Sequence, residues 1–281
     1  MAERQREVPV ALVEMQHVSK AFGPVQALRD VSLYVNPGEV LGLVGDNAAG
    51  KSTLMKILTG ACVADSGRIL LRYRPVTIRK PEDSRRLGIE MVYQDLALAN
   101  NLDVAGNVYL GRELARKWGP FRVLDARAMR EATARMIAEL SVDLPEPRQL
   151  VETLSGGQRQ GVAIGRAMRG NAKLVILDEP TAALSLRATA QVLHLIEQLS
   201  RRKVAVILIS HRLDDVIAAA HRVVVLRQGQ VVAMRVVNKN RPDEFRQLLL
   251  ADMEGIARAD ANTGLRELRP GAGVSCGVAP I

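Results

Sequence analysis

Residues 45 to 53 read GDNAAGKST, the most specific chemical pattern in the chain. The apolar stretch EVLGLV precedes this loop and the amphipathic stretch LMKIL follows it, which predicts a strand before it and a helix after it. In a loop of the form G-x-x-x-x-G-K-S/T, backbone N–H groups cradle the phosphates of a nucleotide. Lys51 should reach the β and γ phosphates, Ser52 should ligate Mg²⁺, and Thr53 is a further phosphate contact. The candidate nucleotide-binding residues of this loop are Gly45, Asp46, Asn47, Ala48, Ala49, Gly50, Lys51, Ser52 and Thr53.

A second motif, LVILDEP at 174 to 180, is an apolar strand that ends in two carboxylates. Asp178 stands where an acid can hold Mg²⁺ through water, and Glu179 stands where a carboxylate can polarise an attacking water. By itself, a strand ending in Asp-Glu is ordinary surface. Its position after a phosphate-binding loop makes both residues candidates for hydrolysis.

A third motif, TLSGGQRQGVAIGRAMRG at 153 to 170, begins with Ser155 and two glycines and continues as a helix. Ser155 is a good N-cap, and the bare backbone of Gly156 and Gly157 makes a helix start that can bind an anion. A purely structural interpretation, a capped helix with a flexible entry, fits this segment equally well when it is taken alone.

The elements around these motifs predict how they are positioned. Residues 9 to 45 alternate short β-like runs with turns, residues 51 to 59 have helical spacing, and residues 96 to 150 are mostly helical and polar, with REATARMIAELSVDL as one amphipathic helix. The runs LVIL, VAVILI and VVVL are typical of strands buried on both faces of a mainly parallel sheet. The phosphate loop, Asp178-Glu179 and His211 follow the strands 40–44, 174–177 and 204–210. All three should therefore lie at one edge of the sheet, where open α/β folds bind ligands.

The composition sets limits on the class of protein. The chain has 281 residues, of which 48% are hydrophobic, enough for one large domain or one domain with an inserted piece. A formal net charge of +9 suits the binding of nucleic acid, anionic lipid headgroups or phosphate-bearing ligands. The dense basic clusters are short, however, and aromatic residues make up only 3%, so the simpler interpretation is that the excess positive charge is spread over the solvated surface. Two distant cysteines, Cys62 and Cys276, fit a reduced, intracellular compartment. The N-terminal stretch has no secretion signal, and no apolar run is long enough to span a bilayer. If the protein acts at a membrane, we therefore expect it to bind there as a peripheral protein.

The order of the three motifs resembles one family. LSGGQ at 154–158, between a phosphate-binding loop and LVILDEP, is similar to the signature of ABC-type ATPases, and the resemblance covers residues 10–250. It implies an α/β, RecA-like P-loop NTPase fold with a mainly parallel sheet, an N-terminal antiparallel β subdomain and an α-helical subdomain inserted at about 96–168. Residues 255–281 are then expected to be a flexible tail.

The resemblance also implies roles for single residues. Phe22 stands where the family stacks an aromatic ring on adenine, Gln94 resembles the glutamine that touches Mg²⁺ and the attacking water, and His211 resembles the histidine that contacts the γ-phosphate. The expected catalytic residues are thus Glu179, His211 and Gln94, the expected metal ligands are Ser52, Gln94 and Asp178, and the further nucleotide contacts are Phe22, Ser155, Gly156, Gly157 and Gln158.

The family's architecture implies the partners. The phosphate loop of one subunit faces LSGGQ of another, so one copy of each motif implies a homodimer, or a pair with a second ABC ATPase, around two composite ATP–Mg²⁺ sites. GDNAAGKSTLMKILTG and VYQDLALANNLDVAGNVYLGRE resemble the ATPases of bacterial monosaccharide importers of the ribose and fructose kind, here with a single copy. This implies a peripheral protein on the cytoplasmic face of the cell membrane that binds a polytopic permease and contacts a sugar-binding protein only indirectly, with no nucleic acid.

Two departures from the family pattern and one rival class stay open. Ser185 in TAALS stands where the family usually has aspartate, which would suit a weakly active or regulatory subunit. Ala48 stands where the family usually has glycine, and we expect it to adopt a negative φ, since alanine is strained at positive φ. The rival is a soluble ABC ATPase that acts on ribosomes or DNA, which the basic charge mildly favours.

Overall fold

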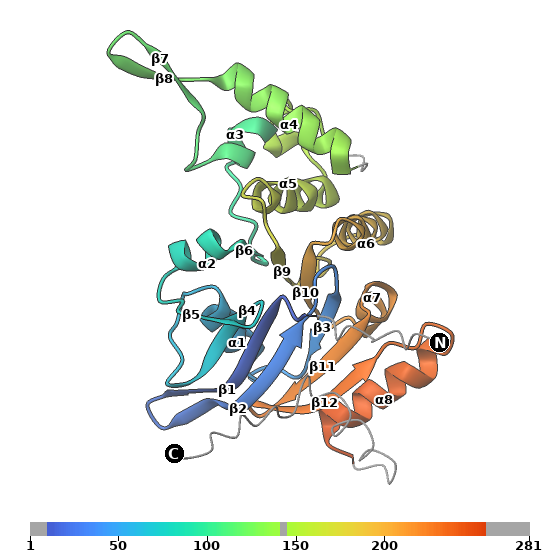
Figure 1. Cartoon of the computed structure of the whole chain (residues 1–281). Coiled ribbons are helices and arrows are strands. Elements are labelled where there is room, and N and C mark those ends of the chain that lie inside the picture. The colour runs from blue at the N-terminus through green and yellow to red at the C-terminus, as the bar shows by residue number, and fades with distance from the viewer. Residues whose placement is uncertain (1–9, 141–144, 257–281) are drawn as a thin grey trace, which may run out of the picture.

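A six-stranded, mainly parallel sheet lies at the centre of the computed structural model, which describes residues 10–140 and 145–256 (Figure 1). Its strand order is β12-β11-β3-β10-β9-β6, and only β12 runs antiparallel to its neighbour. The strands are β3 (Val40–Val44), β6 (Ile89–Val92), β9 (Leu174–Asp178), β10 (Ala205–Ile209), β11 (Arg222–Arg227) and β12 (Gln230–Val236). The strands predicted from the apolar runs are therefore confirmed within a residue or two at each end.

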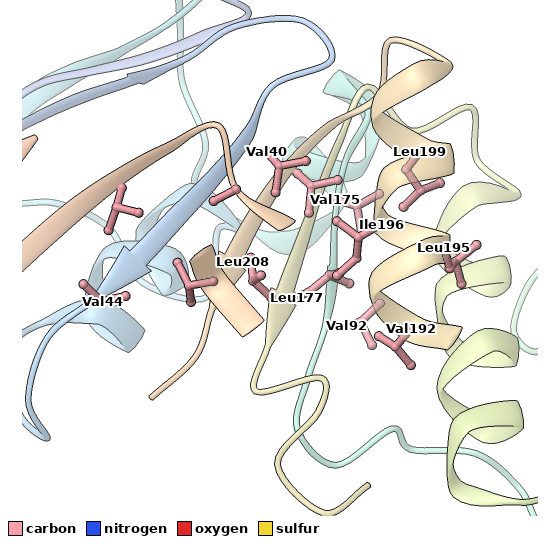
Figure 2. Packing of buried hydrophobic residues seen from close by; sticks show 14 of the residues in the cluster. Val40, Val44, Val92, Val175, Leu177, Val192, Leu195, Ile196, Leu199 and Leu208 are labelled. Atoms are coloured by element: carbon pink, nitrogen blue, oxygen red, sulfur yellow. The ribbon is translucent and has the colours of Figure 1, made fainter. Parts of the chain in front are cut away.

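Alternating side chains bury both faces of this sheet. In β10, Val206 and Leu208 belong to one apolar cluster, whereas Ala205, Ile207 and Ile209 belong to the cluster on the opposite face. Helices cover the first face, and Figure 2 shows side chains of α6, among them Val192 and Ile196, packed against it. These helices are α5 (Gly156–Met168), α6 (Leu186–Arg201), α7 (Leu213–Ala219) and α8 (Pro242–Glu254).

The second face packs against helix α1 (Lys51–Leu58) and an antiparallel sheet of order β2-β1-β4-β5. The strands of that sheet are β1 (Val13–Phe22), β2 (Val25–Val35), β4 (Ser66–Leu71) and β5 (Arg74–Val76), and the short helix α2 (Pro81–Leu87) follows. A buried ion pair joins the two sheets, since Nε of Arg222 in β11 lies 2.8 Å from Oε1 of Glu39 and its Nη2 donates to the Tyr34 carbonyl of β2 at 2.7 Å. The Arg222 guanidinium also stacks on the Tyr34 ring at 4.0 Å.

A separate apolar cluster holds together the helices between β6 and β9. It joins α3 (Val104–Tyr109), α4 (Ala126–Leu140), a 3₁₀ turn (Val151–Thr153) and α5. The predicted amphipathic helix is confirmed up to residue 140, while its residues 141–144 lie outside the described part of the chain. The prediction that 96–150 is mostly helical missed a hairpin, β7 (Ala115–Trp118) and β8 (Phe121–Leu124). Gly119 and Pro120 form its two-residue turn, with Gly119 at a φ of +59°.

The architecture confirms the predicted fold class, an α/β mainly parallel sheet with an N-terminal antiparallel sheet and an added helical part. No helix in the described residues combines the length and apolar character needed to cross a bilayer. The tail expected at 255–281 lies, from residue 257 onward, outside the described residues.

Candidate functional site

Four polar segments follow four neighbouring strands at the carboxyl edge of the parallel sheet. The order β3-β10-β9-β6 places the phosphate loop, His211, Asp178-Glu179 and Gln94 side by side along this edge. The register agrees, because Ile209 pairs with Asp178 and Val92 pairs with Leu177. The predicted convergence of the loop, the two carboxylates and the histidine is therefore confirmed, and Gln94 joins them from the end of β6.

Two glycines allow the phosphate loop to pack closely against the strands around it. A Cβ on Gly45, which has a φ of +148°, would lie 2.1 Å from the Leu226 carbonyl oxygen of β11. A Cβ on Gly50, at a φ of +103°, would lie 2.8 Å from the Ala27 carbonyl oxygen of β2. Side chains at either position would push the loop away from the sheet, so glycine is required on steric as well as backbone grounds.

The prediction that Ala48 has a negative φ is wrong, since its φ is +66°. The Ala49 N–H donates to the Asp46 carbonyl at 3.1 Å, which closes a four-residue turn with Ala48 in the third position. A type II turn needs a positive φ at that position, and glycine normally supplies it. Ala48 is exposed, so its methyl group meets solvent and the cost of the conformation is confined to its own backbone.

Lys51, the first residue of α1, reaches back into the loop. Its Nζ donates to the carbonyls of Gly45 at 2.5 Å and Asp46 at 2.9 Å. Burial lowers the pKa of the Lys51 ammonium, while the negative charges of Glu179, Asp46 and Asp178 oppose that shift. The ammonium is therefore held by the loop carbonyls and feels the negative charge of the acids at the end of β9.

The two acids at the end of β9 differ in environment. Burial, and then the charge of Glu179, raise the pKa of Asp178, whereas Lys51 acts in the opposite direction. Glu179 has a φ of +50°, an unusual conformation for this residue type, and its N–H donates to the Ile209 carbonyl at 2.9 Å. Its Oε2 lies 2.8 Å from Nδ1 of His211. The backbone N–H of His211 donates to the same oxygen at 3.4 Å, so the segment after β10 contacts this carboxylate through both its main chain and its imidazole.

Three residues that the sequence reasoning missed fix the segments after β9 and β10 to each other. The Thr181 hydroxyl donates to Oδ2 of buried Asp215 at 2.6 Å. Arg212 binds the same oxygen through Nε at 3.2 Å and donates from Nη1 to the Thr181 carbonyl at 3.1 Å. This network holds the turn after Glu179 against the turn after His211. The only signal in the sequence was the i, i+3 spacing of Arg212 and Asp215 in ISHRLDD.

A fourth missed residue, Arg166 of α5, holds the segment after Gln94. Its Nη1 donates to the Ala97 carbonyl at 2.8 Å and its Nη2 donates to the Leu96 carbonyl at 2.6 Å. Gln94 itself is exposed, two residues beyond the end of β6. The loop that carries Gln94 is thereby tied to the helix that begins at the SGGQ motif.

The SGGQ motif starts α5 as predicted, with Ser155 as its N-cap. The Ser155 hydroxyl accepts from the Gln158 N–H at 3.3 Å, and the Gln158 side chain accepts from the Ser155 N–H at 3.0 Å. The glycines also permit close packing, since a Cβ on Gly156 would lie 2.8 Å from Leu184 and one on Gly157 would lie 3.0 Å from Ala188. Within residues 10–140 and 145–256, no hydrogen bond joins this motif to the phosphate loop.

Ser185, the departure from aspartate, caps α6. Its hydroxyl accepts from the Ala188 N–H at 3.4 Å, so it performs the helix-capping task that an aspartate would also perform.

Phe22, at the end of β1, is 50% exposed, with Nζ of Lys20 at 5.4 Å from its ring centre. Its hairpin also carries Ala27, whose carbonyl faces Gly50, so this exposed ring belongs to the hairpin that contacts the phosphate loop.

The donors at this edge suit Mg²⁺. No three His, Cys, Asp or Glu side chains in the described part of the chain are grouped closely enough to hold a metal ion by themselves. Mg²⁺ is usually bound by one or two protein ligands, substrate phosphates and waters, so it needs no such group. The Asp178 carboxylate at the end of β9 and the exposed Ser52 hydroxyl in the first turn of α1 fit this pattern.

The chain is similar to proteins of known class. The family described as "ABC transporter" matches residues 28–182. A xylose/arabinose import ATP-binding protein of Sulfolobus acidocaldarius is 38% identical over 85% of this chain and 93% of its own length. A fructose import ATP-binding protein of Rhizobium meliloti is 43% identical over 75% of this chain and 83% of its own. A ribose import ATP-binding protein of Burkholderia pseudomallei is 44% identical over 82% of this chain, but the match spans only 44% of that relative.

The solved structures agree with the sequence relatives. An ATP-binding cassette of an ABC transporter in its ADP conformation superposes with a TM-score of 0.74 and 26% identity, over 87% of this chain and 99% of the other. The loop, the acids and the histidine therefore meet at one sheet edge in a fold that this chain shares with such cassettes. On the family match and the relatives together, this chain belongs to the ABC transporter family.

Proposed function

We propose that this protein is the ATP-binding and ATP-hydrolysing subunit of an ABC importer for a monosaccharide. The observation that carries the proposal is the meeting, at one sheet edge, of the phosphate loop with Glu179 and with His211, whose Nδ1 lies 2.8 Å from the Glu179 carboxylate. The names of the relatives, which are import proteins for xylose/arabinose, fructose and ribose, support the substrate class. No relative named here acts on ribosomes or DNA, so we do not retain the soluble alternative.

The residues would divide the work as follows. Backbone N–H groups of residues 45–53 and the Lys51 ammonium bind the phosphates of ATP. Ser52, Asp178 and Gln94 would hold Mg²⁺, which neutralises phosphate charge when bound. Glu179 accepts a proton from the attacking water, and His211, through Nδ1, holds the Glu179 carboxylate in place. Phe22 offers an exposed ring for the adenine.

Two copies would complete each site. Ser155–Gln158 share no hydrogen bond with the phosphate loop of the same described chain, yet the start of α5 offers free first-turn N–H groups for an anion. A second subunit, a homodimer partner or another ABC ATPase, would bring its SGGQ motif to this phosphate loop. ATP would then hold the two subunits together, and hydrolysis would release them.

The work would be done on a membrane permease, from its cytoplasmic side. We place one nucleotide-binding domain at residues 10–250, with a helical subdomain at about 96–168 that docks on the permease. The separate apolar cluster around α3 and α4 supports the subdomain, and Arg166 offers a mechanical link from it to the Gln94 loop. The sugar-binding protein would contact the permease and not this chain.

The decisive experiment is the variant Glu179→Gln. It should bind ATP with near-normal affinity, lose at least about 100-fold in hydrolysis rate because the general base is gone, and accumulate as an ATP-bound dimer in light scattering. Glu244→Gln, the same change at an exposed residue of α8, is the matched control and should hydrolyse ATP normally. Normal hydrolysis by Glu179→Gln would contradict the proposal. Co-purification with a polytopic permease from a co-expressing cell tests the importer, and salt-sensitive recovery with rRNA or DNA in its place would refute it.

A further inference from the structure

The β7–β8 hairpin projects from the helical part of the molecule, with its turn directed away from the rest of the chain (Figure 1). Seven of its eight strand residues are exposed, and the eighth, Val123, is half-buried. Its base is closed by one hydrogen bond from the Asp125 N–H to the Leu114 carbonyl at 2.8 Å. A two-stranded hairpin with so little covering it is only marginally stable in water, which indicates that something else covers it in the cell.

Aromatic residues stand at the tip of this hairpin. Trp118 and Phe121 pair directly across the strands, next to the turn, and are 75% and 68% exposed. Trp118 is the single tryptophan of the chain, and Phe121 is one of three phenylalanines. In a protein with 3% aromatic residues, two large rings paired in solvent at one protruding tip are not packing residues of the fold.

Basic residues fill the positions behind the tip. Lys117 pairs directly with Arg122 across the strands, and Arg116 precedes them, whereas residues 115–124 contain no acid. None of these three cations has an ion-pair partner anywhere in residues 10–140 or 145–256. Like charges directly opposite each other destabilise a strand pair, so this arrangement calls for a negative surface from outside.

We propose that the β7–β8 hairpin inserts its tip into the interface of an anionic lipid bilayer. Tryptophan prefers the level of the lipid headgroups, where its ring is buried and its N–H stays wet. Cations within a Debye length of anionic headgroups gain attraction that the hairpin lacks in solution. Period-two alternation puts Lys117 and Arg122 on the face opposite Trp118 and Phe121, while Arg116 shares the face of the rings but lies two residues farther from the turn. The rings at the tip can therefore enter the interface while the three charges stay at headgroup level. This contact goes beyond the proposed function and needs neither the permease nor ATP.

Trp118 reports on its own surroundings, because no other tryptophan contributes to the fluorescence. The full chain is mixed with vesicles of phosphatidylcholine alone, or of phosphatidylcholine with phosphatidylglycerol. With the anionic vesicles, Trp118 emission should move to shorter wavelength and be quenched by brominated lipid, and both effects should disappear in high salt. With the neutral vesicles the emission should not change.

Paired variants separate the hairpin from the overall charge. Lys117→Gln with Arg122→Gln should weaken vesicle binding by about 25-fold, since each cation near the surface contributes about fivefold. Arg72→Gln with Arg74→Gln removes the same charge at another exposed turn and should have little effect. ATP hydrolysis should be normal in both, which keeps this test independent of the proposed function.

Several results would overturn the inference. Equal weakening by the two pairs of substitutions would show that only the net charge of +9 attracts vesicles. Sedimentation with vesicles while Trp118 emission stays unchanged would place the contact elsewhere. An emission shift that requires the detergent-solubilised permease, and is absent with lipid alone, would assign the tip to a protein partner.

Discussion

Replacing Ala48 with glycine should stabilise the fold, while the same replacement at Ala49, one residue later, should destabilise it. Ala48 holds a φ of +66° and is exposed, so glycine removes backbone strain and loses no buried surface. Ala49 has no positive φ and is 3% exposed, within the apolar cluster that α1 shares with the sheet. The two changes are chemically identical and differ only in the place that the turn gives them.

The magnitudes follow from opposing terms. Alanine in the left-handed region costs about 1–2 kcal/mol, and the extra freedom of glycine in the unfolded chain takes back about 0.4–1 kcal/mol, so Ala48→Gly should raise the free energy of unfolding by about 0.5–1 kcal/mol. At Ala49 the chain loses a buried methyl group, about 0.8 kcal/mol, and pays the same unfolded-state term, for a net loss of about 1–2 kcal/mol. The two variants should therefore differ by about 2 kcal/mol, or several degrees in Tm.

Urea unfolding without nucleotide, with the slope m checked for constancy, measures both values. Ala48→Val extends the series, because a β-branched residue tolerates positive φ less well than alanine and should destabilise. The reasoning is refuted if Ala48→Gly and Ala49→Gly lower the free energy of unfolding by similar amounts. That result would mean that the turn at 46–49 does not hold Ala48 at positive φ in solution.

Three further outcomes test other parts of the site and fold. Lys51→Ala should weaken ATP binding by at least about 100-fold in calorimetry, since a charge-assisted hydrogen bond to phosphate contributes about 1.5–3 kcal/mol and Lys51 can make two; unchanged affinity would exclude the phosphate role. Asp178→Asn should be more stable than the parent protein at pH 7, because the pKa of Asp178 is raised in the fold. The parent protein loses stability as the pH rises from the unfolded-state pKa to the folded-state pKa of this group, and the loss persists at higher pH. The difference between the two proteins in urea unfolding should vanish below the usual carboxyl range, and a variant less stable than the parent at pH 7 would contradict this. Arg222→Ala should lower the free energy of unfolding by about 3–5 kcal/mol, since it leaves Glu39 buried and unpaired, whereas Arg222→Met with Glu39→Gln should lose much less; equal losses in the two would argue against the ion pair.

Features that depend on interactions between residues close in sequence were predicted, and features that depend on long-range interactions were not. The loop GDNAAGKST, the N-cap at Ser155 and the strands that end at Val44 and Asp178 were predictable because each depends on neighbours within a few residues. The hairpin at 115–124 was missed because its sequence, ARKWGPFRVL, alternates too weakly to be told from a polar helix. Only the Gly-Pro turn carried the signal.

The failure at Ala48 has a similar cause. Steric preference of the single residue favours negative φ, but the hydrogen bond from Ala49 to Asp46 and the close contacts of Gly45 and Gly50 with β11 and β2 fix the shape of the whole loop. Surrounding structure can hold one residue in a conformation that costs about 1–2 kcal/mol. The conformational preference of alanine therefore sets the energetic cost of the positive φ, while the surrounding loop determines that this φ is adopted.

By itself, the sequence determined the chemistry of this protein: a phosphate loop, two acids and a histidine, each after an apolar strand, and hence one sheet edge where they meet. Tertiary structure alone decided which side chains touch there. The pairing of Glu179 with His211, the Thr181–Arg212–Asp215 network and the hold of Arg166 on the Gln94 loop join segments 30 or more residues apart. Local sequence pattern predicts the strands, and parallel strands bring the residues that follow them to one edge of the sheet. Which of those residues bind each other depends on the packing of helices and loops, which local pattern does not predict.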